Sequence, residues 1–319
     1  MTGVSASISP EVAARPLFII NPMSGGGRTR NRVGAIVDAI ERAGLTADVV
    51  FTDRRGHGTE LAREAIEAGR EFLVGCGGDG TVYEVANGIL GMGAGDRVRL
   101  STIGLGTGKD VAKCLGMGRG SLAIKAIAAG KERPIDVGKV TSMGEDGAEQ
   151  VRYFLLEASA GWVPEISQGT PRWLKRLGDT APYMVMAGVK MLGPMGRQFT
   201  LTIDSNRFDG RYNSISVHNM ELWGGDLVAA PGAAPDDGML DVIRWGDLGR
   251  RMVVKVLDAQ RKGGTHVDFD GVDRHPAKSI ELSSPKRSFL DLDGEHGGYL
   301  PAKIEVVPRA LRFVAPAVS

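Results

Sequence analysis

The chain has 319 residues, of which 42% are hydrophobic, enough for one large or two ordinary domains, and we expect two. Its 39 basic and 38 acidic residues nearly balance, which argues against the basic surface of a nucleic-acid-binding protein. No stretch approaches the roughly 20 apolar residues of a membrane-spanning helix. The first 16 residues lack the charged start and apolar core of a signal peptide, so we expect a loose tail on a cytoplasmic protein.

Apolar runs alternate with amphipathic segments from Leu17 to about Arg133. This alternation favours a mostly parallel sheet covered by helices on both faces, a three-layer α/β domain. In that architecture ligands bind beyond the carboxyl ends of the strands. The expected strands are Leu17–Asn21, Ala47–Thr52, Glu71–Cys76 and Val98–Leu105, and the expected helices are residues 28–43, 59–68, 81–90, 110–115 and 122–129.

A glycine-rich run at residues 75–88, Gly-Cys-Gly-Gly-Asp-Gly-Thr-Val-Tyr-Glu-Val-Ala-Asn-Gly, follows the third expected strand. Such a turn presents unpaired backbone N–H groups to one small volume, which suits a phosphate. Thr81 and Glu84 fit the spacing of a capping box that starts a helix. Because Asp79 would repel a bare phosphate, a magnesium-bound nucleotide is the natural ligand. The plain alternative is a tight strand-to-helix loop that simply needs glycines.

Two further glycine-rich turns follow the first and fourth expected strands: residues 21–28, Asn-Pro-Met-Ser-Gly-Gly-Gly-Arg, and residues 104–110, Gly-Leu-Gly-Thr-Gly-Lys-Asp. The second turn does not fit a P-loop, because Ile103 and Asp110 occupy the wrong positions. No G-x-G-x-x-G follows the first strand, which disfavours an ordinary dinucleotide fold. We expect the three turns to converge at one sheet edge and form a single phosphate cradle.

The pattern changes after Pro134, where short strands dominate and predict an antiparallel β-rich domain, a sandwich or barrel, with helical insertions. We therefore expect a nucleotide-binding domain at residues 1–134 and a β-rich domain at residues 135–307. The expected strands are Ile135–Val140, Tyr153–Ala158, Phe199–Asp204, Ser214–His218, Leu240–Trp245, Ser279–Leu282, Phe289–Leu292 and Ile304–Val307, and the helices Ala181–Leu192 and Leu248–Lys262.

Two acidic turns in the β-rich part are candidate sites, although solvated Asp-Gly turns are the simpler interpretation of both. Asp237 and nearby backbone carbonyls could hold a hard cation such as Mg²⁺. A carboxylate in the turn at residues 291–295, Asp-Leu-Asp-Gly-Glu, could take a proton from an alcohol that attacks a phosphoryl group. A methionine-rich helix is more typical of a core than of a binding groove. Large apolar residues could nevertheless line an acceptor groove, and the candidates are Trp162, Trp173, Leu174, Met184, Met186, Met191 and Met195.

Taken together, these motifs resemble the diacylglycerol kinase catalytic-domain family, which includes bacterial lipid kinases and the sphingosine and ceramide kinases. The resemblance rests on their order and spacing along nearly the whole chain. The segments that carry it are Asn21-Pro22 with its glycine-rich loop, Thr52 followed by Gly56-His57, the Gly-Gly-Asp-Gly-Thr string with Glu84 and Asn87-Gly88, Gly106-Thr107-Gly108, Ile135-Asp136, Asp236-Asp237-Gly238 and Asp293-Gly294-Glu295.

The resemblance implies an NAD kinase/diacylglycerol kinase-like fold, with an α/β domain and a β-rich lipid-acceptor sandwich. It also implies that the active site lies in the cleft between these domains, and that the last segment, here residues 308–319, returns to the first domain. It implies an ATP-dependent lipid kinase in which Glu295 accepts the proton, Asp293 lies beside it and Asp79 also serves catalysis. A structural Mg²⁺ would be held by Asp237 and the main-chain oxygens of Ala234 and Met239. The nucleotide would be bound by Asn21, Thr52, Gly77, Gly78, Asp79, Gly80, Thr81, Gly106 and Thr107.

One position departs from the family pattern. The family usually has Asn in its Gly-Thr-Gly-Asn-Asp segment where this chain has Lys109. Lysine adds a positive point charge close to the expected phosphates. The substitution therefore bears on nucleotide choice and on activity.

Two other functions stay open. A kinase of a soluble acceptor such as NAD would share the Gly-Gly-Asp-Gly core, and a non-catalytic nucleotide or lipid sensor would keep the fold. For a lipid kinase we expect transient peripheral membrane contact and no nucleic-acid partner. The acceptor could be diacylglycerol, phosphatidylglycerol, a sphingoid base or a long-chain alcohol. A homodimer through the β-rich half is compatible with the sequence.

Overall fold

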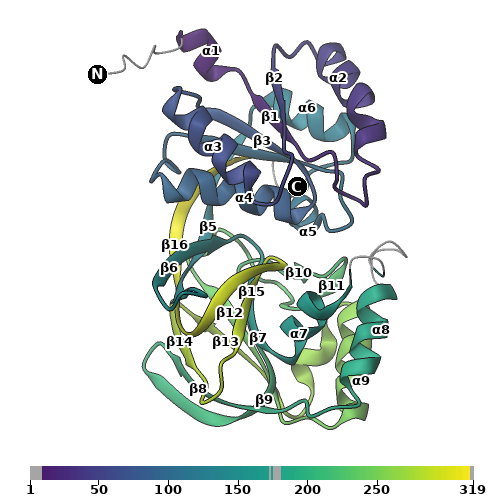
Figure 1. Ribbon diagram of the computed structural model, residues 1–319, viewed down its shortest axis with the longest axis vertical. Helices are drawn as coiled ribbons and strands as arrows, with labels where there is room; N and C mark the ends of the chain where they lie inside the picture. The colour runs from purple at the N-terminus through teal and green to yellow at the C-terminus, as the bar shows by residue number, and fades with distance from the viewer. Residues whose placement is uncertain (1–8, 172–173, 175–180, 317–319) are drawn as a thin grey trace. The chain divides into compact units, whose positions relative to one another are not determined.

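The computed structural model of the protein describes residues 9–171, 174 and 181–316 (Figure 1). The chain forms two compact units. Unit 1 comprises the residues up to Ile135 together with Arg309 onward, and unit 2 comprises Asp136–Pro308. Two long strands, β5 (Glu132–Met143) and β16 (Glu295–Val314), carry the chain out of unit 1 and back into it.

Unit 1 contains a parallel sheet in the order β2-β1-β3-β4, and the last residues of β16 extend it beside β4. Helix α3 packs against α4, and α2 against α6. Its other elements are α1 (Pro10–Ala14), β1 (Leu17–Ile20), η1 (Arg30–Arg32), α2 (Val33–Arg42), β2 (Asp48–Phe51), α3 (His57–Glu67), β3 (Phe72–Gly77), α4 (Asp79–Gly91), β4 (Arg99–Gly104), α5 (Asp110–Cys114) and α6 (Ser121–Ala129).

The central strands of this sheet are apolar along their whole length. Every residue of β1 (Leu-Phe-Ile-Ile) and of β3 (Phe-Leu-Val-Gly-Cys-Gly) is buried, as expected for parallel strands with helices packed against them. Helix α2 instead buries only Ile36 and Ile40, one turn apart, and exposes its other face. These buried runs fix where β1, β3 and β4 end, and therefore where the turns after them lie.

The expectation of a loose tail before residue 17 is wrong for residues 10–14. These residues form α1, which begins with Pro10 after Ser9 accepts the N–H of Val12. The helix is attached to unit 1 because Glu71 donates its N–H to Ala13 and Arg70 donates Nη1 to the carbonyl of Val12. Five residues are too few for the hydrophobic periodicity to reveal such a helix.

Unit 2 is rich in antiparallel strands. One run of paired strands has the order β13-β12-β9-β7-β15-β16, while β8 joins β9 to β14, and β5 pairs with β6. Its remaining elements are β6 (Glu149–Phe154), β7 (Glu157–Gly161), α7 (Trp162–Gly169), α8 (Ala181–Lys190), β8 (Arg197–Ile203), β9 (Asn206–His218), β10 (Leu222–Trp223), β11 (Leu227–Val228), β12 (Leu240–Gly246), α9 (Arg250–Arg261), η3 (Thr265–Asp268), β13 (Val272–Ala277), β14 (Ser279–Ser283) and β15 (Phe289–Leu292).

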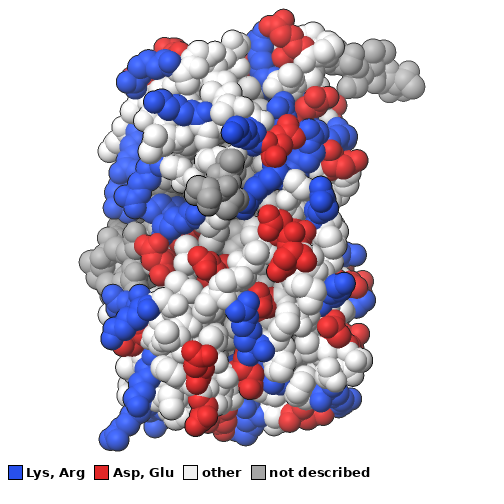
Figure 2. All heavy atoms as spheres, turned by 180° about the vertical axis from the view of Figure 1, so that it is seen from behind, with Lys and Arg blue, Asp and Glu red and all other residues white. Residues whose placement is uncertain are grey.

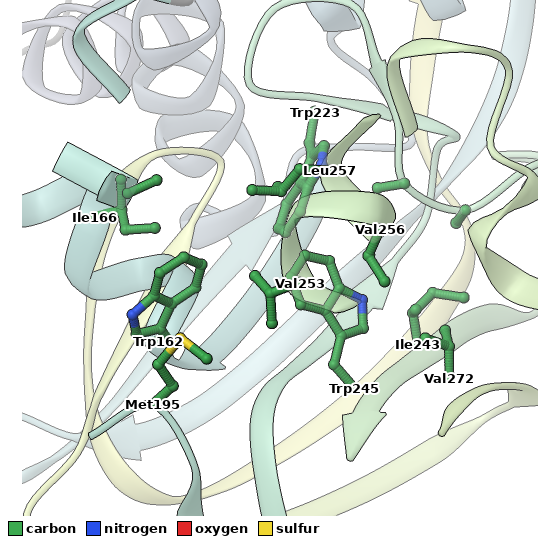
Figure 3. Packing of buried hydrophobic residues seen from close by; sticks show 13 residues of the cluster. Trp162, Ile166, Met195, Trp223, Ile243, Trp245, Val253, Val256, Leu257 and Val272 are labelled. Carbon is green, nitrogen blue, oxygen red and sulfur yellow. The ribbon is translucent and has the colours of Figure 1, made fainter. Parts of the chain in front are cut away.

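A core cluster in unit 2 packs helices α7, α8 and α9 onto the strands (Figure 3). Trp162 and Trp245 are 1% exposed, and Met195 is 8% exposed. Met186 and Met191 are partly buried against the same cluster. These residues, together with buried Leu174, therefore belong to the core rather than to an open acceptor groove. Trp173 and the side chain of Met184, also named for that groove, lie outside the described residues.

Candidate functional site

The turn after β3 leads directly into α4, which begins at Asp79 with Gly78 as its N-cap. The expected capping box is wrong, because α4 has no side-chain cap and Glu84 already lies inside the helix. Glu84 instead accepts the N–H groups of Gly56 at 2.7 Å and Gly58 at 2.9 Å, at the start of α3. The carboxylate thus satisfies N–H groups of a different helix, whose N-cap residue, Gly56, has positive φ and no side chain to act as a cap.

The turn after β4 lies directly against the turn after β3. Leu105 and Gly106 both donate N–H groups to the carbonyl of Gly77, at 2.7 and 3.0 Å, and Asp79 donates its N–H to the carbonyl of Gly108. A Cβ on Gly106 would come within 2.5 Å of the Gly78 Cα. Only glycine allows the two backbones to approach this closely.

Asp79 joins the two turns through its side chain. Its Oδ2 and Oδ1 atoms accept the N–H groups of Asp110 and Val111, each at 3.1 Å, where α5 begins. Lys109 is the N-cap residue of α5 and makes no side-chain cap bond. The Asp79 carboxylate therefore holds the start of α5. This structural role accounts for an acidic residue in a turn that is expected to bind phosphate.

The glycine-rich loop after β1 completes this group of turns. Gly25, Gly26 and Gly27 all have positive φ, which favours glycine at each position. Asn21 donates its N–H to Cys76 at 2.9 Å, and its Nδ2 lies 3.4 Å from Thr81 Oγ1. Gly25 also approaches the carbonyl of Leu105 so closely that an added Cβ would lie 3.3 Å from it. The three turns therefore meet within unit 1, which confirms the predicted convergence.

The residues proposed to bind the nucleotide all lie in or next to these turns. Thr52 follows β2 and donates its N–H to Ile20 at 2.9 Å, and Gly77, Gly78, Gly80 and Thr81 surround the start of α4. Gly106 and Thr107 lie in the turn after β4. The N-terminus of the 13-residue helix α4, with its partial positive charge, points into the same region. Glycine-rich turns next to the positive end of a helix dipole can hold an anion.

In unit 2, Glu295 begins β16 immediately after a two-residue hairpin turn. Asp293 and Gly294 form the turn with φ values of 52° and 85°, and Leu292 pairs with Glu295 across it. Positive φ at both central residues is what the tight Asp-Gly hairpin turn requires. Gly294 also donates its N–H to Asp291 Oδ1 at 2.7 Å.

The Asp293 carboxylate anchors this hairpin. It accepts the N–H groups of Leu155 and Leu156 at 2.8 Å each and of Glu157 at 2.9 Å. These donors lie at the break between β6 and β7, so the expected continuous strand Tyr153–Ala158 is wrong at residues 155 and 156. The strand breaks because its N–H groups bond a side chain instead of a neighbouring strand. Asp293 is 8% exposed, and burial raises its pKa to about 7 despite the opposing effect of the three amide donors.

Glu157 is a buried carboxyl group that the sequence does not reveal. Burial raises its pKa well above the usual range, and the negative charges of Asp291 and Asp293 raise it further. A hydrogen bond to Ser159 works in the opposite direction. The protonated form of Glu157 is therefore favoured. The strand pattern around Glu157 gave no sign that a charged residue would point into the interior.

Asp237 lies in an exposed turn before β12, and its Oδ1 accepts the N–H of Met239 at 2.9 Å. The adjacent Gly238 donates its N–H to Asp136 Oδ2 at 2.7 Å, which fixes the turn. Ala234 and Met239 flank it. Across residues 9–171, 174 and 181–316, no three His, Cys, Asp or Glu residues form a group able to hold a metal ion. A cation here would need backbone oxygens in addition to Asp237.

Comparison with known proteins identifies both units. Residues 15–140 match the family described as diacylglycerol kinase catalytic domain, and residues 166–315 match the YegS C-terminal NAD kinase beta sandwich-like domain. A Bacillus subtilis diacylglycerol kinase is 28% identical over 306 residues, covering 95% of this chain and 96% of its own. A diacylglycerol kinase from Staphylococcus aureus strain MRSA252 is 29% identical over 309 residues, covering 95% of this chain and 92% of its own.

Two crystal structures of Bacillus anthracis proteins share the fold. Their TM-scores are 0.78 and 0.70, at 24% and 21% sequence identity. They cover 98% and 95% of this chain, and the alignments span 98% and 97% of theirs. The second is described as a diacylglycerol kinase.

Proposed function

The chain belongs to the diacylglycerol kinase catalytic-domain family of lipid kinases, and we propose that it transfers the γ-phosphoryl group of ATP to a lipid hydroxyl, such as that of diacylglycerol. The observation that carries this proposal is the meeting of three glycine-rich turns around the start of α4. Relatives of similar length that are named diacylglycerol kinase support the same acceptor class.

The turns of unit 1 suit the phosphates of a nucleotide. Glycines at positions 25–27 leave backbone atoms uncovered by Cβ, and α4 directs the positive end of its dipole toward the same region. Asn21, Thr52 and Thr107, which lie in the surrounding turns, would also bind the nucleotide. Asp79 holds the turn after β4 in place through α5, so its contribution to catalysis is positional.

Glu295 accepts the proton of the lipid hydroxyl. In the same hairpin, Asp293 has both carboxylate oxygens engaged by backbone N–H groups, which suits it to fixing the turn. Glu295 stands at the first position of β16 and is only partly buried. A base must lie within hydrogen-bond reach of the proton it removes, and a rigid hairpin turn keeps its side chain in a defined place.

Asp237, with the main-chain oxygens of Ala234 and Met239, would hold a structural Mg²⁺. The donor set fits a hard cation, because carboxylate and carbonyl oxygens are its preferred ligands. The hydrogen bond from Gly238 to Asp136 keeps this turn in one conformation. A second Mg²⁺, bound together with ATP, would offset the negative charge of the nucleotide phosphates.

Finer features of the protein also belong to this proposal. We take unit 1 to be three-layered, because α3 pairs with α4 and α2 with α6, and unit 2 to be a β-sandwich. Cys76 and Cys114 form no disulfide bond within the described residues, which supports a reducing, cytoplasmic location. The same proposal includes a role in phospholipid biosynthesis, peripheral membrane contact and a homodimer through unit 2.

The test is a phosphorylation assay with radiolabelled ATP and an array of acceptors: diacylglycerol, phosphatidylglycerol, a sphingoid base, a long-chain alcohol and NAD. We expect a lipid product whose formation stops in Glu295→Gln, while ATP binding stays near the wild-type level. Glu281→Gln is the matched control, since Glu281 is an exposed strand residue of unit 2. Phosphorylation of NAD alone would favour the soluble-acceptor kinase, and wild-type turnover in Glu295→Gln would rule out its role as the base.

A further inference from the structure

Helices α8 and α9 of unit 2 expose an unusual share of apolar surface. Nine large hydrophobic side chains are exposed among the described residues, and four of them lie on these helices or on the turn that follows α8. They are Val185 (53% exposed), Val189 (54%), Leu192 (83%) and Val254 (51%). Scattered exposed apolar residues are normal, but a concentration of them marks an interaction surface.

The apolar residues of α8 form a stripe. Val185, Val189 and Leu192 are spaced by four and three residues, which places them on one face of the helix. The turn continues the helical path, since Leu192 donates its N–H to the carbonyl of Val189 at 3.1 Å. The opposite face carries Ala187, which is 3% exposed and packs into the core cluster. The exposed stripe is therefore additional to the face that α8 uses for folding.

Helix α9 supplies positive charge near this stripe. Residues 250–262 contain five basic residues and a single acidic one, Asp258, whereas Val253 and Val256 are fully buried in the same core cluster. Arg250 Nε donates to the carbonyl of Met191 at 2.5 Å, which joins the start of α9 to the turn after α8. Figure 2 shows Lys and Arg side chains along the edge of unit 2 where α8 and α9 lie in Figure 1.

Most of this positive charge is not neutralised within the chain. Lys262 pairs with Asp258 at 2.7 Å. Over the described part of the chain, Arg251, Lys255 and Arg261 form no ion pair. Arg251, Val254 and Lys255 are all exposed, and their spacing places them on one side of α9. The surface thus combines aliphatic side chains with basic side chains, the two features that hold an amphipathic helix at an anionic bilayer.

We propose that the exposed faces of α8 and α9, the α8/α9 face, dock the protein on the surface of an anionic lipid bilayer. Val185, Val189, Leu192 and Val254 enter the boundary between headgroups and acyl chains, and Arg251, Lys255 and Arg261 lie against anionic headgroups. The unpaired basic side chains of α9 complement the negative charge of an anionic bilayer. The choice of a bilayer rests on the proposed function, since a lipid kinase must reach an acceptor in a membrane.

The test is co-sedimentation of the full-length protein with vesicles that contain no diacylglycerol. Vesicles of phosphatidylcholine alone are compared with vesicles of phosphatidylcholine and phosphatidylglycerol. We expect binding to the anionic vesicles, weakened about tenfold or more in Val189→Asp/Leu192→Asp and in Arg251→Glu/Lys255→Glu. High salt should weaken wild-type binding as well. Val151→Asp and Lys286→Glu are the matched controls, since Val151 and Lys286 are exposed residues elsewhere in unit 2.

Kinase activity is measured separately, with a short-chain diacylglycerol dispersed in detergent micelles. Loss of vesicle binding in the α8/α9 variants supports the docking proposal even if no lipid is phosphorylated. The result of the vesicle experiment is therefore independent of the catalytic assay. Wild-type vesicle binding by both double variants would overturn it, and so would equal wild-type binding to neutral and anionic vesicles. Self-association that disappears in Val189→Asp/Leu192→Asp, without any vesicle binding, would show a contact between two copies of the chain instead.

Discussion

Asp293 Oδ1 accepts the backbone N–H of Leu156 at 2.8 Å, so the hairpin that carries Glu295 is tied to the break between β6 and β7. Leu155 and Glu157 donate to the same carboxylate. Three consecutive N–H groups of the chain thus converge on one buried side chain. The position of the Glu295 hairpin depends on that side chain as much as on the strands around it.

Replacing Asp293 with Asn should destabilise unit 2. Asn tolerates the positive φ of this turn, but its amide nitrogen cannot accept an N–H, so at least one buried donor loses its partner. We expect the free energy of unfolding to fall by about 1–3 kcal/mol. Urea unfolding followed by tryptophan fluorescence measures this, because all four tryptophans lie between residues 162 and 245. Unchanged stability in Asp293→Asn would contradict an anchoring role.

The two raised carboxyl pKa values make the stability of unit 2 depend on pH. Because the pKa of Asp293 is about 7 in the folded protein, its proton stabilises the fold fully below about pH 4, and this contribution is lost as the pH rises through 7. The pKa of Glu157 is raised too, so its contribution is likewise lost as the pH rises above the usual carboxyl range. Glu157→Gln stays neutral, and we expect a smaller loss of stability between about pH 5 and pH 8 than in the wild type. Urea unfolding at both pH values tests this, and the same loss in both proteins would contradict it.

Gly106→Ala should separate the turns after β3 and β4. The new Cβ would lie 2.5 Å from the Gly78 Cα and 2.7 Å from its backbone nitrogen, and neither atom can move without shifting the start of α4. We expect ATP affinity to fall about tenfold or more, because small displacements of a binding site are costly. Gly34→Ala is the control, since nothing lies within 4 Å of its added Cβ and alanine favours the helix. Calorimetric titration with ATP measures both, and equal affinities would show that the turns do not form the phosphate site.

Lys109→Asn should weaken ATP binding without destabilising α5. Lys109 is half-buried beside the turn after β4, and its positive charge would attract the nucleotide phosphates. The N–H groups of Asp110 and Val111 already bond Asp79, so the fold does not rely on residue 109 as a cap. We expect ATP affinity to fall roughly three- to tenfold at low salt, with a smaller effect at high salt. Lys125→Asn, on the exposed side of α6, is the control. Wild-type affinity in Lys109→Asn at low salt would place the lysine outside the nucleotide site.

The parallel strands and the meeting of the glycine-rich turns could be predicted from the sequence. Buried strands such as β3 are apolar throughout, and turns that follow parallel strands must lie at one edge of a sheet. The hairpin at Asp293-Gly294 was also visible, because Asp-Gly is a strong hairpin signal. These features depend on local sequence and on a general rule of topology.

The side-chain bonds could not be predicted. Glu84 has the spacing of a capping residue for its own helix, yet it accepts hydrogen bonds from the N–H groups of Gly56 and Gly58, 28 and 26 residues earlier in the chain. Asp293 similarly accepts a hydrogen bond from the N–H of Leu155, 138 residues away, and so breaks a strand that the sequence predicts to be continuous. A single sequence carries no record of which distant N–H groups a carboxylate will meet. The burial of Glu157 follows from the same long-range packing.

The residues of β16 that complete the sheet of unit 1 are synthesised after all of unit 2. Phe313 is fully buried and pairs with Leu100 of β4, and Ser101 donates its hydroxyl to the carbonyl of Val314 at 2.8 Å. During translation, the edge of β4 therefore stays uncovered until all of unit 2 has been synthesised. Unit 2 has its complete sequence at that stage and can fold first, whereas unit 1 needs Arg312 and Phe313 to close its sheet.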